Sequence, residues 1–188
     1  MSDVARYALG PARGAEIIKQ EGESWTLVLV RTLRHSPERV WRALTDPAEL
    51  REWAPFDADH DLSTAGASVR LTTVGAPSPH VTETTITRAD APKLLEYTWG
   101  GRDMRWELEA VGAGTRLTLW ASIDRRYIAL GVAGRHVCLD VLDHLLSETP
   151  IGRIVGPAAM KVEGWQQLYG EYSRQFGVEP PSWSRGEA

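Results

Sequence analysis

Three side chains in the last third of the chain have the types and the spacing for metal binding or proton transfer. His136, Asp140 and His144 recur at every fourth position, so a helix would place them on one face, where they could converge on a metal ion or exchange a proton. The same positions form the polar side of the predicted helix, where a solvated His–Asp pair is the commoner arrangement. We therefore predict no metal site, and we treat His136 and Asp140 as candidate catalytic residues.

Acidic residues in two predicted strands offer further candidate sites. Asp57, Asp59 and Asp61 alternate along one strand, with oxygen ligands at a spacing that could hold a hard cation. An acidic edge that faces solvent is the interpretation that we favour for them. Glu83 lies among threonines, and inside an apolar cavity its raised pKa would suit general acid–base chemistry. An exposed strand glutamate is the favoured alternative there too.

Composition excludes several classes of function. The 188-residue chain has a net charge of −4 and no basic stripe, so we predict no binding to nucleic acid or to an anionic membrane. No apolar run approaches the roughly 18–20 residues that span a bilayer, and residues 1–14 lack the apolar core of a signal peptide. We expect a cytoplasmic protein. The motifs GxSxG and HExxH and the phosphate-binding P-loop are absent from the sequence.

The single cysteine, Cys138, excludes an intramolecular disulfide and a zinc site built from several thiolates. It falls on the apolar face of its predicted helix, and no basic neighbour that would lower its pKa is evident. We therefore interpret it as a small buried hydrophobic residue.

Two short helices are predicted in quick succession near the middle of the first half. Ser36-Pro37 and Asp46-Pro47 each place a capping side chain before a proline, which suits the first turn of a helix. The second helix ends near Trp53, because Pro55 cannot continue it. Each helix carries an apolar stripe with a tryptophan, Trp41 in the first and Trp53 in the second, and therefore packs one face on a larger element.

The remaining pattern predicts a single domain over residues 16–178, between flexible segments at residues 1–15 and 179–188. Short turn clusters separate the predicted strands and imply antiparallel neighbours. The strands are expected at residues 16–19, 25–33, 57–62, 69–74, 81–88, 94–99, 104–110 and 116–123. Two longer amphipathic helices are expected at residues 132–147 and 158–176.

Strict alternation indicates that one face of the sheet is buried. Tyr97 and Trp99 share a face in one strand, as do Met104 and Trp106 in the next. Trp120 falls on the polar side instead. It is expected to cover an edge, a neighbouring segment or a second subunit, or to stay partly exposed, so a homodimer is possible.

Several motifs resemble a known family. Residues 31–55 (RTLRHSPERVWRALTDPAELREWAP), 94–99 (LLEYTW) and 112–122 (GAGTRLTLWAS) are similar to the family named after the activator of heat-shock protein 90 ATPase, within the START-like superfamily. The resemblance implies an α+β helix-grip fold, as in the birch pollen allergen, with a curved antiparallel sheet around a long C-terminal helix and an apolar cavity between them. This chain departs from the pattern by appending a further helix at residues 158–176. This helix is expected to cover the protein's own core; the alternatives are that it caps the cavity entrance, lies on the sheet or packs against a second subunit.

The resemblance and the aromatic residues together favour the binding of a small, mostly apolar ligand, without a cofactor. Such residues commonly line pockets as well as cores. The predicted contacts are Trp53, Phe56, Tyr97, Trp99, Trp106, Cys138 and Leu142.

Two alternatives stay open. One is an enzyme similar to polyketide cyclases and aromatases, in which Glu83, Tyr97 or the His136–Asp140 pair would point into the cavity and move protons. The other is a domain that contacts a chaperone. We expect no chaperone binding, because the family's chaperone activators carry an additional N-terminal domain that the residues before the first strand cannot supply.

Overall fold

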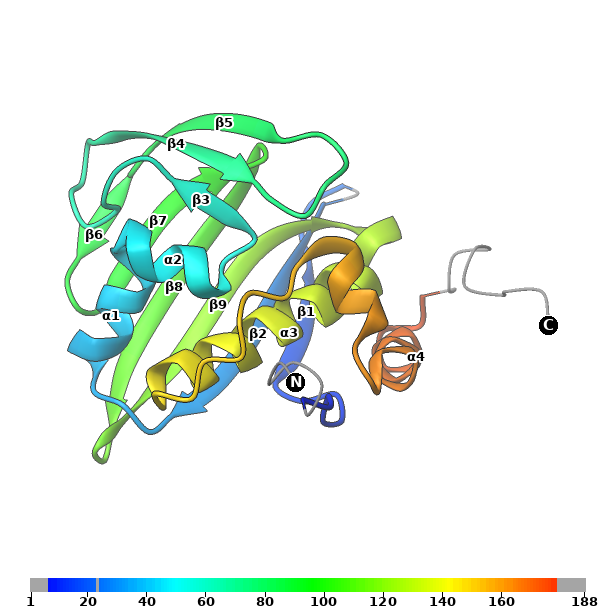
Figure 1. The fold of residues 1–188 in the computed structure, drawn as a ribbon. Helices are drawn as coiled ribbons and strands as arrows, with labels where there is room; N and C mark the ends of the chain where they lie inside the picture. The colour runs from blue at the N-terminus through cyan, green and yellow to red at the C-terminus, as the bar shows by residue number, and fades with distance from the viewer. Residues whose placement is uncertain (1–6, 23, 179–188) are drawn as a thin grey trace.

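The computed structural model describes residues 7–22 and 24–178 (Figure 1). Its strands are β1 (Ala15–Lys19), β2 (Ser24–Leu33), β3 (Phe56–Ala58), β4 (Ser68–Thr73), β5 (His80–Thr85), β6 (Arg88–Asp90), β7 (Leu94–Trp99), β8 (Arg102–Val111) and β9 (Gly114–Asp124). Its α-helices are α1 (Pro37–Thr45), α2 (Pro47–Trp53), α3 (Ile128–Leu146) and α4 (Trp165–Phe176), and two 3-10 helices are η2 (Arg125–Tyr127) and η3 (Gly156–Lys161).

The predicted α+β helix-grip arrangement is confirmed. Six strands form an antiparallel sheet in the order β1-β2-β9-β8-β7-β6, and α3 lies across one face of it (Figure 1). β2 and β9 are far apart in the sequence and pair from Ser24 opposite Asp124 to Leu33 opposite Thr115. β3, β4 and β5 form a separate three-stranded sheet beside α2.

The strand predicted at residues 81–88 is interrupted, because its backbone changes partners. Ile86 exchanges hydrogen bonds with the loop before β4, donating to Ala67 and accepting from Gly66. The next amide, of Thr87, donates instead to Glu96 in β7. The chain therefore passes from the small sheet to the large one at this point.

Both short helices begin as predicted. The side chains of Ser36 and Asp46 accept hydrogen bonds from backbone amides in the first turns of α1 and α2. The indole nitrogen of Trp53 donates to the carbonyl of Ala43 at 2.9 Å, which fixes α2 against α1. The two helices pack on α3 and close one end of the space between α3 and the sheet.

The alternation in the large sheet is also confirmed. Tyr97, Met104 and Trp106 are buried on the face that α3 covers. Trp120 lies on the opposite face, half-buried between its register partners Val28 and Arg105.

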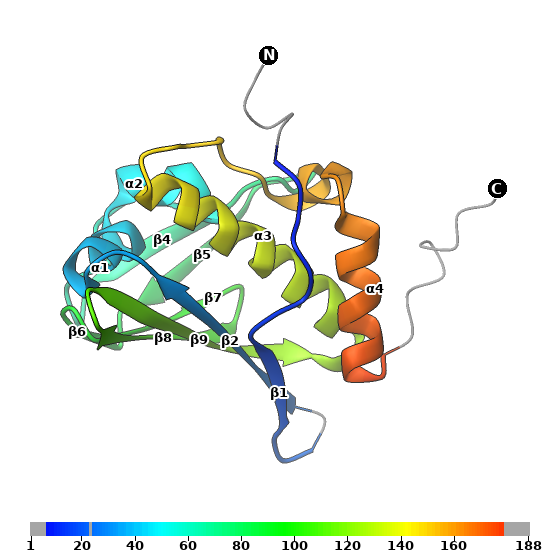
Figure 2. The same ribbon diagram turned by 90° about the horizontal axis from the view of Figure 1, so that it is seen from below.

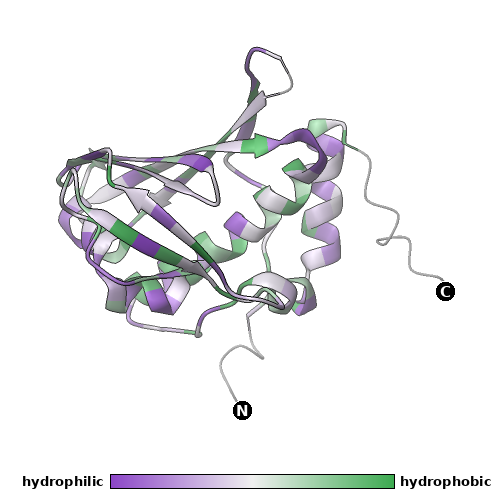
Figure 3. Cartoon of the chain, turned by 90° about the horizontal axis from the view of Figure 1, so that it is seen from above, coloured by the Kyte–Doolittle hydropathy of each residue, from purple (hydrophilic) through white to green (hydrophobic). Residues whose placement is uncertain are grey.

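The appended helix α4 covers the protein's own core by packing on α3 rather than on the sheet (Figure 2). Tyr172 is completely buried in this contact, and Trp165 is almost completely buried. Hydrophobic and hydrophilic residues are mixed along α4, as expected of a helix with one buried face (Figure 3). The predicted single helix at residues 158–176 is instead η3 followed by α4, because Gly164 adopts a left-handed backbone with φ of 88° between them.

Part of the segment predicted to be flexible, residues 1–15, lies against α3. Residues 7–14 cross α3 on the way to β1 (Figure 2), and the amide of Leu9 donates to the carbonyl of Glu163 at 3.0 Å. The predicted flexibility of residues 1–6 and 179–188 lies outside the described residues.

The strand predicted at residues 57–62 is shorter, and the three aspartates do not share a strand face. β3 ends at Ala58, after which Asp59 accepts from the amide of Arg70 and Asp61 accepts from the amide of Ser63. Asp57 pairs with Arg153 at 2.6 Å. Within residues 7–22 and 24–178, no three His, Cys, Asp or Glu side chains gather as a metal site would require.

Among the helices that the structure describes, none combines the length and the apolar character needed to cross a membrane.

Candidate ligand site

A small apolar cavity lies where α2, the large sheet and α3 meet. Its volume is about 20 Å³. Its wall consists of Trp53, Pro55, Phe56, Trp99, Met104, Trp106, Leu119, Arg135, Cys138 and Leu139. Five of the predicted ligand contacts, Trp53, Phe56, Trp99, Trp106 and Cys138, lie in this wall. Tyr97 and Leu142 are buried nearby but do not line it.

The aromatic wall is held by edge contacts between rings. Trp53 and Trp106 meet at 88° with their ring centroids 6.0 Å apart. The ring centroid of Phe56 lies 5.4 Å from that of Trp99 and 6.2 Å from that of Tyr97. Such T-shaped and tilted pairs are the arrangements that aromatic side chains prefer. These ring contacts therefore hold the side chains of the wall in one arrangement.

The polar atoms of these rings are paired with the protein itself. The indole nitrogen of Trp99 donates to the Thr73 hydroxyl at 3.1 Å, and that of Trp106 donates to the Tyr97 hydroxyl at 3.1 Å. Trp53 donates to a carbonyl of α1, as described above. The tryptophans consequently present carbon surface to the cavity.

Arg135 is the charged residue of the wall, and our sequence interpretation missed it. It precedes Cys138, Leu139 and Leu142 by three, four and seven residues, which is the spacing of one helix face. This spacing could have predicted that Arg135 lies on the same helix face as the predicted ligand contacts Cys138 and Leu142. It also corrects our statement that Cys138 has no basic neighbour.

The guanidinium of Arg135 is poorly paired. One terminal nitrogen donates to the Gly131 carbonyl at 3.3 Å, whereas Nε is sealed from water and has no hydrogen-bond partner among the described residues. No carboxylate within the described part of the chain forms an ion pair with it. Burial, and secondarily the positive charge of Arg102, lower the pKa of Arg135.

Cys138 is buried as predicted. Burial raises the pKa of its thiol to about 12, although the nearby charge of Arg135 acts in the opposite direction. The thiol is therefore protonated at neutral pH and does not have the character of a nucleophile.

The four candidate catalytic residues do not meet at this cavity. Glu83 is exposed on β5. Tyr97 faces the core, where burial raises the pKa of its phenol. His136 and Asp140 come together as a pair, but they lie on the side of α3 that faces α4 and residues 7–14.

The His136–Asp140 pair is buried rather than solvated, so this prediction was wrong. The side chain of His136 is completely buried, with Nδ1 2.8 Å from the Tyr172 hydroxyl in α4 and Nε2 3.4 Å from Asp140 Oδ2. The second distance is an ion-pair contact without hydrogen-bond geometry. The solvent that we expected on this face is replaced by α4 and by residues 7–14.

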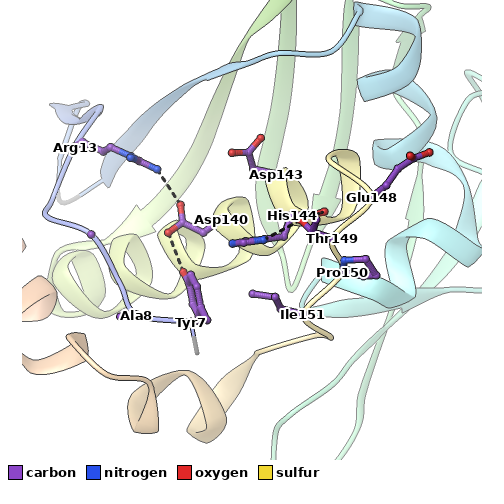
Figure 4. A pocket seen from close by; sticks show the side chains of 11 residues that line it. Tyr7, Ala8, Arg13, Asp140, Asp143, His144, Glu148, Thr149, Pro150 and Ile151 are labelled. Carbon is purple, nitrogen blue, oxygen red and sulfur yellow. Dashed lines mark hydrogen bonds and ion pairs between the residues drawn. The ribbon is translucent and has the colours of Figure 1, made fainter. Parts of the chain in front are cut away.

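Asp140 fastens residues 7–14 to α3 (Figure 4). Tyr7 donates to its Oδ2 at 2.8 Å, and Arg13 pairs with its Oδ1 at 3.2 Å. Burial alone would raise the pKa of Asp140, but the contacts with His136, Tyr7 and Arg13 outweigh burial and lower it.

His144 takes no part in this pair. Its Nδ1 lies 3.3 Å from the Thr149 hydroxyl, and its ring meets the Tyr7 ring edge-on (Figure 4). It lines a broad hollow of about 810 Å³ with Asp140, Asp143 and Glu148, whereas His136 does not line this hollow. The spacing of His136, Asp140 and His144 therefore does not produce a single site.

Comparison with solved structures supports the fold. A conserved protein of unknown function from Enterococcus faecalis, EF2215, is similar with a TM-score of 0.63 and 18% identity over 88% of this chain and 92% of that one. CalU16 from Micromonospora echinospora is similar with a TM-score of 0.62 and 18% identity, over 87% of this chain and 99% of that one. An AHSA1-like protein from Aeromonas hydrophila is similar with a TM-score of 0.55 and 17% identity, over 67% of this chain and 94% of that one. At these identities the likeness concerns the fold alone.

None of the curated proteins matches this chain. The family model described as "Activator of Hsp90 ATPase homolog 1-like protein" matches residues 34–147, more than half of the sequence. This range includes α1, α2 and α3 and every residue of the cavity wall. The chain therefore belongs to the Activator of Hsp90 ATPase homolog 1-like family.

Proposed function

We propose that this protein binds a small, mostly apolar molecule between α2, the large sheet and α3. The observation that carries the proposal is the aromatic wall. The indole nitrogens of Trp53, Trp99 and Trp106 are hydrogen-bonded within the protein, and their rings present carbon atoms to the same cavity. Pockets with such walls suit apolar ligands, whose burial is favourable in proportion to the apolar area removed from water.

Binding requires the cavity to widen. A volume of about 20 Å³ has room for no more than about one water molecule. The wall contains two long, unbranched side chains, Met104 and Arg135, whose rotamer changes would open space without moving the backbone. Ligand entry is therefore proposed to displace these two side chains, while the tryptophans stay in place.

The methionines provide a direct test. The sequence contains three, at positions 1, 104 and 160, and of the two that the structure describes, Met104 lines the cavity and Met160 does not. In protein labelled with ¹³C at the methionine methyl groups, naphthalen-2-ylmethanol is expected to shift the Met104 resonance and to leave Met160 unchanged. The absence of a Met104 shift with this alcohol and also with its carboxylate analogue 2-naphthoate, each at millimolar concentration and with the protein folded, would contradict the proposal.

A filling variant and a matched control locate the binding. Cys138→Leu adds carbon into the cavity and is expected to abolish the Met104 shift. Cys138→Ser changes the volume little and is expected to preserve it. Equal binding by both variants, each checked for a cooperative thermal transition, would place the probe elsewhere and would argue against this cavity.

The enzyme alternative receives no support from the placement of its candidate residues. Among the described residues that line the cavity, none is Glu, Asp, His or Tyr, so no proton-transfer pair lies beside the proposed ligand.

A further inference from the structure

Arg135 has no acidic partner, unlike nine of the arginines that the structure describes. Ion pairs with carboxylates engage many of the others within the described residues, including Arg105 with Glu96 and Arg153 with Asp57. Arg31 is buried and likewise has no ion pair among the described residues; one terminal nitrogen donates to the carbonyls of Arg13 and Val30, whereas Nε and the other terminal nitrogen have no partner. The ionisable groups that act on Arg135 are Arg102, Tyr97 and Cys138, none of which is negative at neutral pH.

A half-buried guanidinium that lies beside an apolar wall, with one hydrogen bond and no acidic partner among the described residues, is unfavourable for the protein. Removing a cation from water costs free energy unless a partner of opposite charge and a full set of hydrogen bonds replace the lost hydration. Here Nε has no acceptor, and the one hydrogen bond, to Gly131, is made to the preceding turn of the same helix. The described residues therefore supply no acceptor for Nε and no charge partner for Arg135.

Arg102 strengthens the positive character of this side of the cavity. It lies two residues before Met104 on β8, and its parity places it on the same inner face of the sheet. Its register partner is Trp99, itself part of the wall. Like Arg135, it forms no ion pair with the described residues.

We propose that the ligand of this cavity is an amphipathic acid, with a carboxylate or similar small anionic group bound by Arg135 and an apolar body among Trp53, Trp99 and Trp106. This inference rests on the proposed function and adds the charge of the ligand to it. A planar guanidinium suits a carboxylate because its donors form a fork that matches two oxygens. The tryptophan faces supply the apolar contact.

Two probes with one aromatic body separate charge from apolar contact. 2-Naphthoate carries a carboxylate, and naphthalen-2-ylmethanol replaces it with a neutral alcohol. Titrations followed at the Met104 methyl are expected to give at least about tenfold tighter binding of the acid by the wild-type protein, which corresponds to about 1.4 kcal/mol.

Variants assign this preference to Arg135. Arg135→Leu is expected to weaken naphthoate binding about tenfold and to leave the alcohol within about threefold of wild type, so that the preference disappears. Arg135→Lys keeps the charge and is expected to retain part of it. Arg51→Leu, at an exposed position of α2, removes the same charge nearby and is expected to keep the full preference.

The outcomes distinguish the two proposals. If both probes bind at Met104 with equal affinity, or if Arg135→Leu keeps the preference for the acid, the Arg135 proposal is overturned and the proposed function stands. If neither probe shifts Met104 in the wild-type protein, both proposals are overturned.

Discussion

Nδ1 of His136 lies 2.8 Å from the hydroxyl oxygen of Tyr172, 36 residues later in the sequence. This contact joins α3 to α4 at a point where both side chains are completely buried. The same hydroxyl donates to the carbonyl of Arg13, so one oxygen connects two helices and the segment before β1. The histidine that looked like a catalytic candidate therefore holds the appended helix in place.

Removing that hydroxyl should destabilise the protein. Tyr172→Phe leaves His136 Nδ1 buried without a partner, which costs about 1–3 kcal/mol. Urea unfolding followed by circular dichroism measures the loss. Tyr127→Phe removes a hydroxyl from a half-exposed side chain and should change the free energy of unfolding by less than about 0.5 kcal/mol. Equal effects of the two substitutions would show that the buried contact contributes nothing.

Asp140 should make stability depend on pH. Its pKa is lower in the folded protein than in the unfolded chain, so folding favours the ionised carboxylate. This contribution is complete above the unfolded value of about 3.9 and is lost as the pH falls through the lower, folded value. Asp140→Asn is therefore expected to lower the free energy of unfolding at pH 7 by about 1–3 kcal/mol, with a smaller difference from wild type at pH 3.

Urea unfolding at the two pH values measures this dependence, and hydrogen exchange reports on residues 7–14, which should exchange faster in Asp140→Asn. Asp143→Asn is the matched control, because that carboxylate forms no ion pair with the described residues. If the difference in the free energy of unfolding between Asp140→Asn and wild type stayed constant from pH 7 to pH 3, the proposed contribution of the ionised Asp140 carboxylate to stability would be contradicted.

The sequence predicted what depends on local pattern and left out what depends on distant packing. Capping residues and alternation were enough to place the two short helices and the tryptophan wall. The burial of His136 was not predictable, because Tyr172 and Tyr7, which cover it, come from segments far away in the chain. The volume of the cavity could not be predicted from the sequence either, because it depends on how the side chains of Met104 and Arg135 pack between the aromatic rings.

Two glycines should respond in opposite ways to alanine. Gly164 has φ of 88°, and a Cβ there would lie 3.0 Å from the Leu9 carbonyl oxygen, so Gly164→Ala should destabilise by about 1–2 kcal/mol. Gly134 lies within α3, where a Cβ would meet nothing within 4 Å. Gly134→Ala should stabilise by about 0.5–1 kcal/mol, because glycine loses more backbone entropy in a helix. Thermal denaturation compares the pair, and the same sign for both would refute the conformational argument.

Arg135→Leu should raise the stability of the ligand-free protein. Replacing a poorly paired guanidinium by an apolar side chain removes the cost of holding a charge beside an apolar wall, and replacements of buried ion pairs by apolar residues gain up to about 1–4 kcal/mol. Because Arg135 is half-buried, we expect the lower end of that range, measured by urea unfolding without any probe. The matched Arg51→Leu should leave the midpoint nearly unchanged, since its side chain is exposed. A clear loss of stability in Arg135→Leu would mean that the arginine supports the fold in the absence of a ligand. The lack of an acidic partner would then no longer support the proposal that Arg135 binds the carboxylate of a ligand.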